Sequence, residues 1–132
     1  MPVTKREYYE MLKKAAIDGT LPSVTPDSQC LYRGPNETKC VVGILIEDED
    51  YHESFEGSAV WDLDHELIKK ILPQSMTIKD LEQIQDLHDR RARMDSRGEQ
   101  VWNGEEFIEA LNQLDCFKEF ASVNAGELKA PE

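Results

Sequence analysis

Cys40 and His88 are the residues whose types are best suited to covalent chemistry in this chain. A cysteine at a helix N-terminus has a lowered thiol pKa, and an imidazole accepts the proton that an attacking thiol releases. Asp89 or Gln85 can orient that imidazole. Packed cysteines and hydrogen-bonded core histidines have the same residue types and are more common. A thiol-dependent hydrolase or transferase that uses Cys40 and His88 is therefore the alternative hypothesis.

Cys30, Cys40 and His88 also offer the thiolate and imidazole ligands that zinc prefers. Structural zinc sites use cysteine pairs about two to four residues apart, and the wider spacing of Cys30 and Cys40, with no second pair, does not match. The sequence therefore predicts no metal and no cofactor. The odd number of cysteines, three, favours free thiols in a reducing compartment.

The charge of the chain excludes one class of function. With 27 acidic against 15 basic residues among 132, the formal net charge is -12. Affinity for a phosphate backbone comes from cationic contacts, so we expect no direct binding to nucleic acid. The chain begins with no apolar leader and contains no run of ~18 apolar residues, which predicts a cytoplasmic protein without a membrane span.

The acidic residues concentrate in one part of the chain, residues 47–66, which contains no lysine or arginine. Aromatic residues are interleaved with the carboxylates, as in surfaces that engage basic proteins. An acidic loop that only keeps the protein in solution is the simpler interpretation. The predicted partner-binding residues are Glu47, Asp48, Glu49, Asp50, Tyr51, Glu53, Phe55, Glu56, Asp62 and Asp64.

Four helices are expected from their capping residues. Thr4 and Glu7 form a capping box before an apolar stripe that ends at Gly19. Asp64, Thr77 and Asn103 are the other expected N-caps, each before residues with helical apolar spacing.

Two short segments, residues 30–33 and 39–42, flank a turn-rich centre and predict a small β-hairpin. Residues 40–46 suit a helix or a strand, and we favour a short helix beginning near Cys40. The predicted fold class is α+β, mainly α, with about four to five helices packed on a small β-hairpin. Residues 1–120 are expected to form a single domain, followed by a flexible tail, residues 121–132.

The hairpin and the helix with Gln85 carry a resemblance. Cys30 and Tyr32-Arg33 precede the turn, Lys39-Cys40-Val41-Val42-Gly43 follows it, and Gln85-Asp86-Leu87-His88-Asp89 comes later. This arrangement resembles a family of small uncharacterised bacterial and phage proteins with a Lys-Cys-Ala-Val-Gly segment and a downstream Gln-x-x-His-Asp helix. The resemblance extends to an acidic segment with a tyrosine and to Glu56-Gly57, and it departs at Glu37 and Val41. It implies a fold and no activity.

Small acidic phage proteins often act by binding a host factor. The acidic run, taken together with the phage setting, leads to the working hypothesis of a non-enzymatic acidic binding protein that modulates or inhibits a host nucleic-acid-handling or defence complex, in the manner of an anti-CRISPR protein. The expected partner is a basic or nucleic-acid-binding host protein. The oligomeric state cannot be read from this sequence, and a regulatory subunit that pairs through its hairpin is a third hypothesis.

Overall fold

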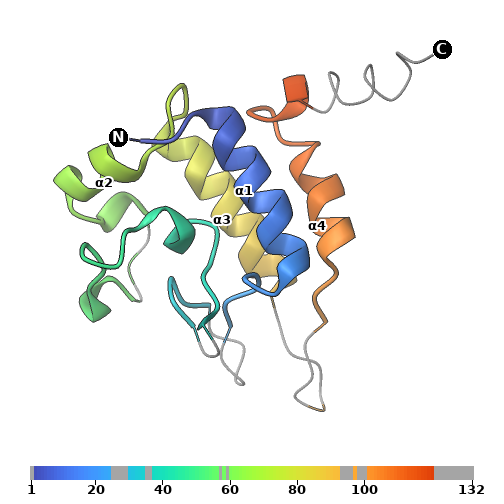
Figure 1. The fold of residues 1–132 in the computed structure, drawn as a ribbon, viewed down its shortest axis with the longest axis horizontal. Helices are drawn as coiled ribbons and strands as arrows, with labels where there is room; N and C mark the ends of the chain where they lie inside the picture. Colours follow the sequence, from blue (N-terminus) through green and yellow to red (C-terminus); the bar gives the residue numbers. More distant parts are fainter. Residues whose placement is uncertain are drawn as a thin grey trace.

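A computed structural model describes residues 2–24, 30–34, 37–56, 58, 60–92, 97 and 101–120. Most of the regular structure is helical (Figure 1). In the described part of the chain, the helices are α1 (Lys5–Asp18), α2 (His65–Ile71), α3 (Ile78–Arg91) and α4 (Gly104–Leu111), with the 3-10 helices η2 (Gly43–Leu45), η3 (Glu53–Phe55) and η4 (Val60–Asp62). The predicted tail, residues 121–132, lies outside the described residues.

The predicted caps of α1 are confirmed. The Thr4 hydroxyl accepts a hydrogen bond from the Glu7 amide, and the Glu7 carboxylate accepts one from the Thr4 amide. These bonds satisfy backbone donors that the first turn leaves free, and they lower the pKa of Glu7. At the other end, Gly19 adopts a left-handed conformation with φ of 94°.

The other three predicted N-caps are confirmed as well. Thr77 forms a capping box with Asp80 at the start of α3, while the Asp64 and Asn103 side chains accept amide hydrogen bonds at the starts of α2 and α4. Each cap involves residues two or three positions apart, so these helix starts are determined locally.

The core lies between α1, α3 and α4, with α4 in contact with both of the others. Tyr8 and Tyr9 of α1 are fully buried, as are Phe107 and Phe117 at the C-terminal end. In Figure 1, α4 lies along one side of α1 and α3, and α2 and the 3-10 helices lie on the other side of the view. No helix in the described part of the chain has the length and apolar character needed to cross a bilayer.

The prediction of a β-hairpin packed on the helices is wrong. Arg33 and Lys39 form one isolated antiparallel bridge, and no sheet is present in the described residues. The ladder ends at Tyr32, because the Tyr32 amide donates to a distant carboxylate rather than to the second segment. The Glu56 carboxylate accepts from the Tyr32 and Arg33 amides, and the Lys39 amide donates to the Thr20 carbonyl. In the described residues the fold is therefore mainly α, with isolated β-bridges between loops.

After Cys40 the chain turns and enters η2 at Gly43, so the helical interpretation of this segment is confirmed in the form of a short 3-10 helix. Gly43 is required by packing. A Cβ atom at this position would lie 1.9 Å from the Tyr32 carbonyl oxygen. This close approach holds the turn after Cys40 against residues 30–33.

Candidate functional site

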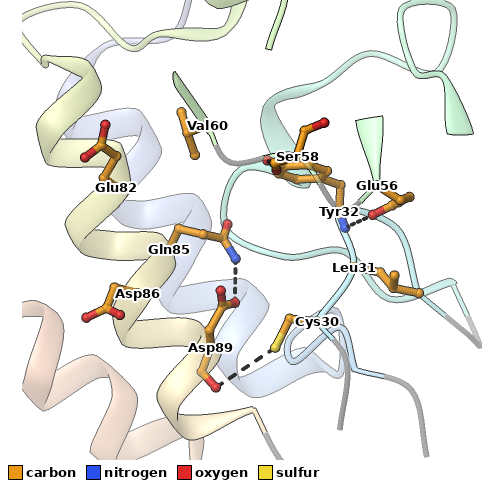
Figure 2. A pocket seen from close by; sticks show the side chains of 10 residues that line it. All are labelled: Cys30, Leu31, Tyr32, Glu56, Ser58, Val60, Glu82, Gln85, Asp86 and Asp89. Carbon is orange, nitrogen blue, oxygen red and sulfur yellow. Dashed lines mark hydrogen bonds between the residues drawn. The ribbon is translucent and has the colours of Figure 1, made fainter. Parts of the chain in front are cut away.

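A pocket of about 420 Å³ lies between α3 and the central loops. Figure 2 shows α3 forming one wall, with Gln85 and Asp89 facing Cys30, Tyr32 and Glu56 on the other. The lining residues are Cys30, Leu31, Tyr32, Glu56, Ser58, Val60, Glu82, Gln85, Asp86 and Asp89. We call this cavity the α3 pocket.

The α3 pocket combines apolar walls with carboxylates. Glu56, Glu82, Asp86 and Asp89 line it, and no lysine or arginine is among its lining residues. Three of these carboxylates belong to α3, where their spacing puts them on neighbouring turns of the helix. The pocket therefore favours a cation over an anion.

The carboxylate of Asp89 is held in place through one of its oxygens. Its Oδ1 atom accepts a hydrogen bond of 2.6 Å from Gln85 Nε2 and lies 2.9 Å from His88 Nδ1. Its other oxygen, Oδ2, accepts no N–H or O–H hydrogen bond from the described residues. The Cys30 thiol also forms a hydrogen bond with this carboxylate. The network thus orients the Asp89 carboxylate at the edge of the pocket.

His88 is fully buried, and both of its ring nitrogens have partners. The backbone N–H of Ser23 donates to Nε2 at 3.2 Å, so Nε2 carries a lone pair. The proton of the neutral ring is then on Nδ1, where it donates to Asp89. The Trp102 ring packs against the imidazole at 5.9 Å between centroids. His88 therefore joins α3 to residues 21–24 and orients Asp89.

Cys40 has a different set of partners from those of a catalytic thiol. Its Sγ atom donates to Gln85 Oε1 at 3.2 Å and accepts from the Gly43 amide at 3.2 Å. Burial raises the pKa of the thiol to about 12. Since both nitrogens of His88 are engaged elsewhere, this geometry does not favour a Cys40–His88 nucleophile and base.

The group with metal-ligand types is not the one considered from the sequence. The ligand atoms of Cys30, His88 and Asp89 lie within 4.8 Å of one another, whereas Cys40 is not in this group. A metal on Nδ1 would move the imidazole proton to Nε2, which faces the Ser23 N–H donor. Metal-bound histidines normally donate their other N–H to an acceptor, so this arrangement does not fit a metal.

Glu56 is a structural residue as well as a pocket wall. Its carboxylate accepts from the Tyr32 amide at 2.8 Å, the Arg33 amide at 3.1 Å and the Tyr51 hydroxyl at 2.6 Å. The Arg33 guanidinium instead pairs with Asp48 at 2.8 Å. Glu56 therefore connects the backbone amides of residues 30–33 to the side chain of Tyr51.

The predicted partner-binding residues divide into two groups. Tyr51, Phe55 and Glu56 are partly buried, and the two aromatic rings pack edge to face against each other at 6.1 Å. Asp50 is also partly buried, and it pairs with Lys70 at 3.0 Å, which raises the pKa of Lys70. The exposed group consists of Glu47, Asp48, Glu49, Glu53, Asp62 and Asp64.

Sequence reasoning missed the contribution of α3 to the pocket. Glu82, Asp86 and Asp89 recur at helical spacing, and this spacing was the available signal for an acidic stripe. Ser23 carried no signal, because its backbone N–H rather than its side chain makes the contact with His88.

Comparison with known proteins found no matching family model, curated protein or solved structure. Residues from several parts of the chain meet in the pocket. Cys30, Tyr32, Glu56, Gln85 and Asp89 all line the α3 pocket, although they come from separate parts of the chain (Figure 2). Cys40 and His88 lie behind them, bonded to Gln85 and Asp89.

Proposed function

We propose that this protein is a non-enzymatic acidic binding protein that acts in the cytoplasm on a basic, nucleic-acid-handling host protein. It modulates or inhibits that protein by contact, in competition with nucleic acid. The surface that makes the contact lies on residues 47–66, which we call the acidic segment. Its exposed carboxylates make most of the contact.

The proposal is carried by the unpaired carboxylates of the acidic segment. Glu47, Glu49, Glu53 and Asp62 are exposed, and no lysine or arginine of the described residues forms an ion pair with them. Lys70 attracts Glu47 and Glu49 without forming an ion pair with either. Carboxylates whose charges are not balanced within the molecule attract the cations of a partner. Their arrangement on turns and 3-10 helices displays them to solvent.

The carboxylates that are paired do not oppose this role. Asp48 is 87% exposed despite its ion pair with Arg33. Exposed ion pairs contribute at most about 1 kcal/mol to stability, so a partner's arginine or lysine can replace the internal cation at small cost. A basic surface that normally holds phosphates would find a similar density of negative charge here.

The biological setting comes from the resemblance to small bacterial and phage proteins. A phage-encoded protein that blocks a defence complex is the member of this functional class that the acidic surface fits best. Direct binding to nucleic acid is not part of the proposal, because the net charge of -12 opposes it.

The experiment is affinity capture from bacterial lysate at about 50 mM and about 500 mM salt, since screening weakens contacts between exposed charges. A test variant removes four charges of the acidic segment: Glu47→Gln, Asp48→Asn, Glu49→Gln and Asp50→Asn. A matched control removes four exposed charges on and beside the α1 and α4 helices: Glu10→Gln, Glu105→Gln, Glu109→Gln and Asp115→Asn.

We expect a basic nucleic-acid-binding protein to be captured at low salt, released at high salt, retained by the control variant and lost with the test variant. Equal loss with both variants would mean that only total charge matters, and the assignment to the acidic segment would be wrong. Capture of no basic protein would contradict the proposed function.

A further inference from the structure

The α3 pocket has the two features that a long basic side chain requires. Leu31, Tyr32 and Val60 provide apolar contact for a methylene stem, while Asp86 and Asp89 provide carboxylates. Among the described residues no cationic side chain lines the cavity, and of these two carboxylates only Asp86 has an internal cationic partner, Arg90.

We propose that the α3 pocket receives one arginine side chain of the basic partner, with its guanidinium on the Asp89 carboxylate. This inference rests on the proposed function and adds to it a specific anchor, because Asp89 of α3 lies outside the acidic segment.

Asp89 is prepared for this contact before any partner arrives. Gln85 and His88 both bind its Oδ1 atom, and His88 is itself fixed by the Ser23 amide. Side chains that are held by their neighbours lose less conformational freedom on binding. The guanidinium would meet this carboxylate in competition with the neutral Cys30 thiol, which is a weak donor.

Across the pocket, the Cys30 thiol adds no charge. Burial, and then the neighbouring Asp89 carboxylate, raise the pKa of this thiol to about 12. The thiol is therefore neutral at physiological pH, so it contributes no charge that would repel or attract a cation.

The carboxylates of α3 favour arginine over lysine. A guanidinium has five N–H donors in one plane, so it can bind one carboxylate in bidentate fashion and still donate to a second. Asp86 and Glu82 lie one and two turns of α3 away from Asp89 on the pocket side. An ammonium group is more compact and more strongly hydrated, so it gains less from this arrangement.

Carboxylates on neighbouring turns of α3 also repel each other, and a bound cation would reduce this repulsion. Glu82 and Asp86 are four residues apart on α3, a spacing at which equal charges repel. The ion pair between Asp86 and Arg90 at 2.9 Å offsets part of the repulsion at Asp86. Among the described residues, Glu82 has no cationic partner.

The test uses small probes and the full chain. Two-dimensional amide NMR follows titration with propylguanidinium, which mimics an arginine side chain, with butylammonium, which mimics lysine, and with uncharged propylurea. We expect saturable shifts at the amides around Tyr32, Gln85 and Asp89 with propylguanidinium. Asp89→Asn should weaken this binding by ~10-fold, the scale of one lost charged hydrogen bond.

Two further variants keep the result interpretable. The double change Glu82→Gln and Asp86→Asn alters two other carboxylates of the same pocket, one partly buried and one exposed, so it tests the site even if Asp89→Asn unfolds. The double change Glu105→Gln and Asp115→Asn is the distant control and should leave binding unchanged. Shifts that follow all exposed carboxylates, or equal binding of propylurea, would overturn the pocket assignment.

A synthetic peptide of alternating arginine and serine separates this inference from the proposed function. If the peptide binds, is released by salt and is lost with the acidic-segment variant while propylguanidinium leaves the pocket unchanged, the arginine anchor is wrong and the acidic surface remains. If neither the peptide nor propylguanidinium binds, both proposals are contradicted.

Discussion

The backbone N–H of Ser23 donates a hydrogen bond of 3.2 Å to Nε2 of His88, and both residues are fully buried. This contact joins a loop near the N-terminus to the C-terminal half of α3. It also decides the tautomer of the imidazole, and through Nδ1 it decides the orientation of Asp89 in the α3 pocket.

Replacing His88 tests this structural role. We expect His88→Leu to lower the free energy of unfolding by about 2–4 kcal/mol, because it leaves the buried Ser23 N–H without an acceptor. Urea denaturation measures the change.

Ser23→Ala is the matched control for this prediction. The Ser23 hydroxyl oxygen is buried with no hydrogen-bond partner in the described residues, while the bond to His88 uses the main chain. Ser23→Ala should therefore be nearly neutral. A small effect of His88→Leu, or a large effect of Ser23→Ala, would show that this contact does not stabilise the fold.

Gly43→Ala should destabilise the protein by about 2–3 kcal/mol, because the new methyl group would press on the main chain at Tyr32 and the turn would have to move. Gly19→Ala is the comparison: its Cβ meets nothing within 4 Å, and only its φ of 94° is unfavourable, which costs about 1 kcal/mol. Thermal or urea unfolding gives both values. Equal losses would contradict the close approach of η2 and residues 30–33.

Thiol reactivity distinguishes packed cysteines from a catalytic one. The pKa values of Cys30, Cys40 and Cys116 are all raised by burial, so few thiolates are present at neutral pH. We expect Cys30, which is partly exposed, to be alkylated first and Cys40 to react only slowly until the protein unfolds. Peptide mapping after timed iodoacetamide treatment measures the order. Rapid modification of Cys40 would favour the alternative hypothesis of a thiol-dependent enzyme.

Stability should also fall at alkaline pH. The folded-state pKa of Cys40 is raised to about 12 from an ordinary value of 9.0, so the unfolded chain loses this proton first. The stability linked to Cys40 is therefore complete below about pH 9 and is lost as the pH rises toward 12. Cys40→Ser keeps a hydrogen-bond donor for Gln85 and does not titrate in this range, so its unfolding free energy should fall less between about pH 8 and about pH 10. Equal slopes would contradict the buried, protonated thiol.

Local features of the fold were predictable from the sequence. The Thr4 and Thr77 capping boxes depend on residues three positions apart, and the helical spacing of Leu81, Ile84 and His88 puts His88 on the buried face of α3. These predictions hold because capping and helical spacing are short-range properties.

Long-range hydrogen bonds decided what the sequence could not. The Glu56 carboxylate accepts from the Tyr32 amide, which a hairpin would have used, and also from the outward-facing Arg33 amide. No pattern in residues 30–33 predicts a partner more than 20 positions later. Arg33 likewise has two partners far along the chain: Glu56 binds its main-chain amide, and Asp48 pairs with its guanidinium. The sequence around Gly43 does not show that a glycine is required there, because the requirement comes from the close approach of the Tyr32 carbonyl.

The central claim is that the acidic segment competes with nucleic acid for a basic protein. The most direct measurement is fluorescence anisotropy of labelled DNA or RNA bound to the captured basic protein, titrated with this protein. The account predicts that the wild-type chain releases the nucleic acid, that the control variant does so equally, and that the variant lacking the charges of Glu47, Asp48, Glu49 and Asp50 does not. Nucleic acid that stays bound at saturating wild-type protein would contradict the account.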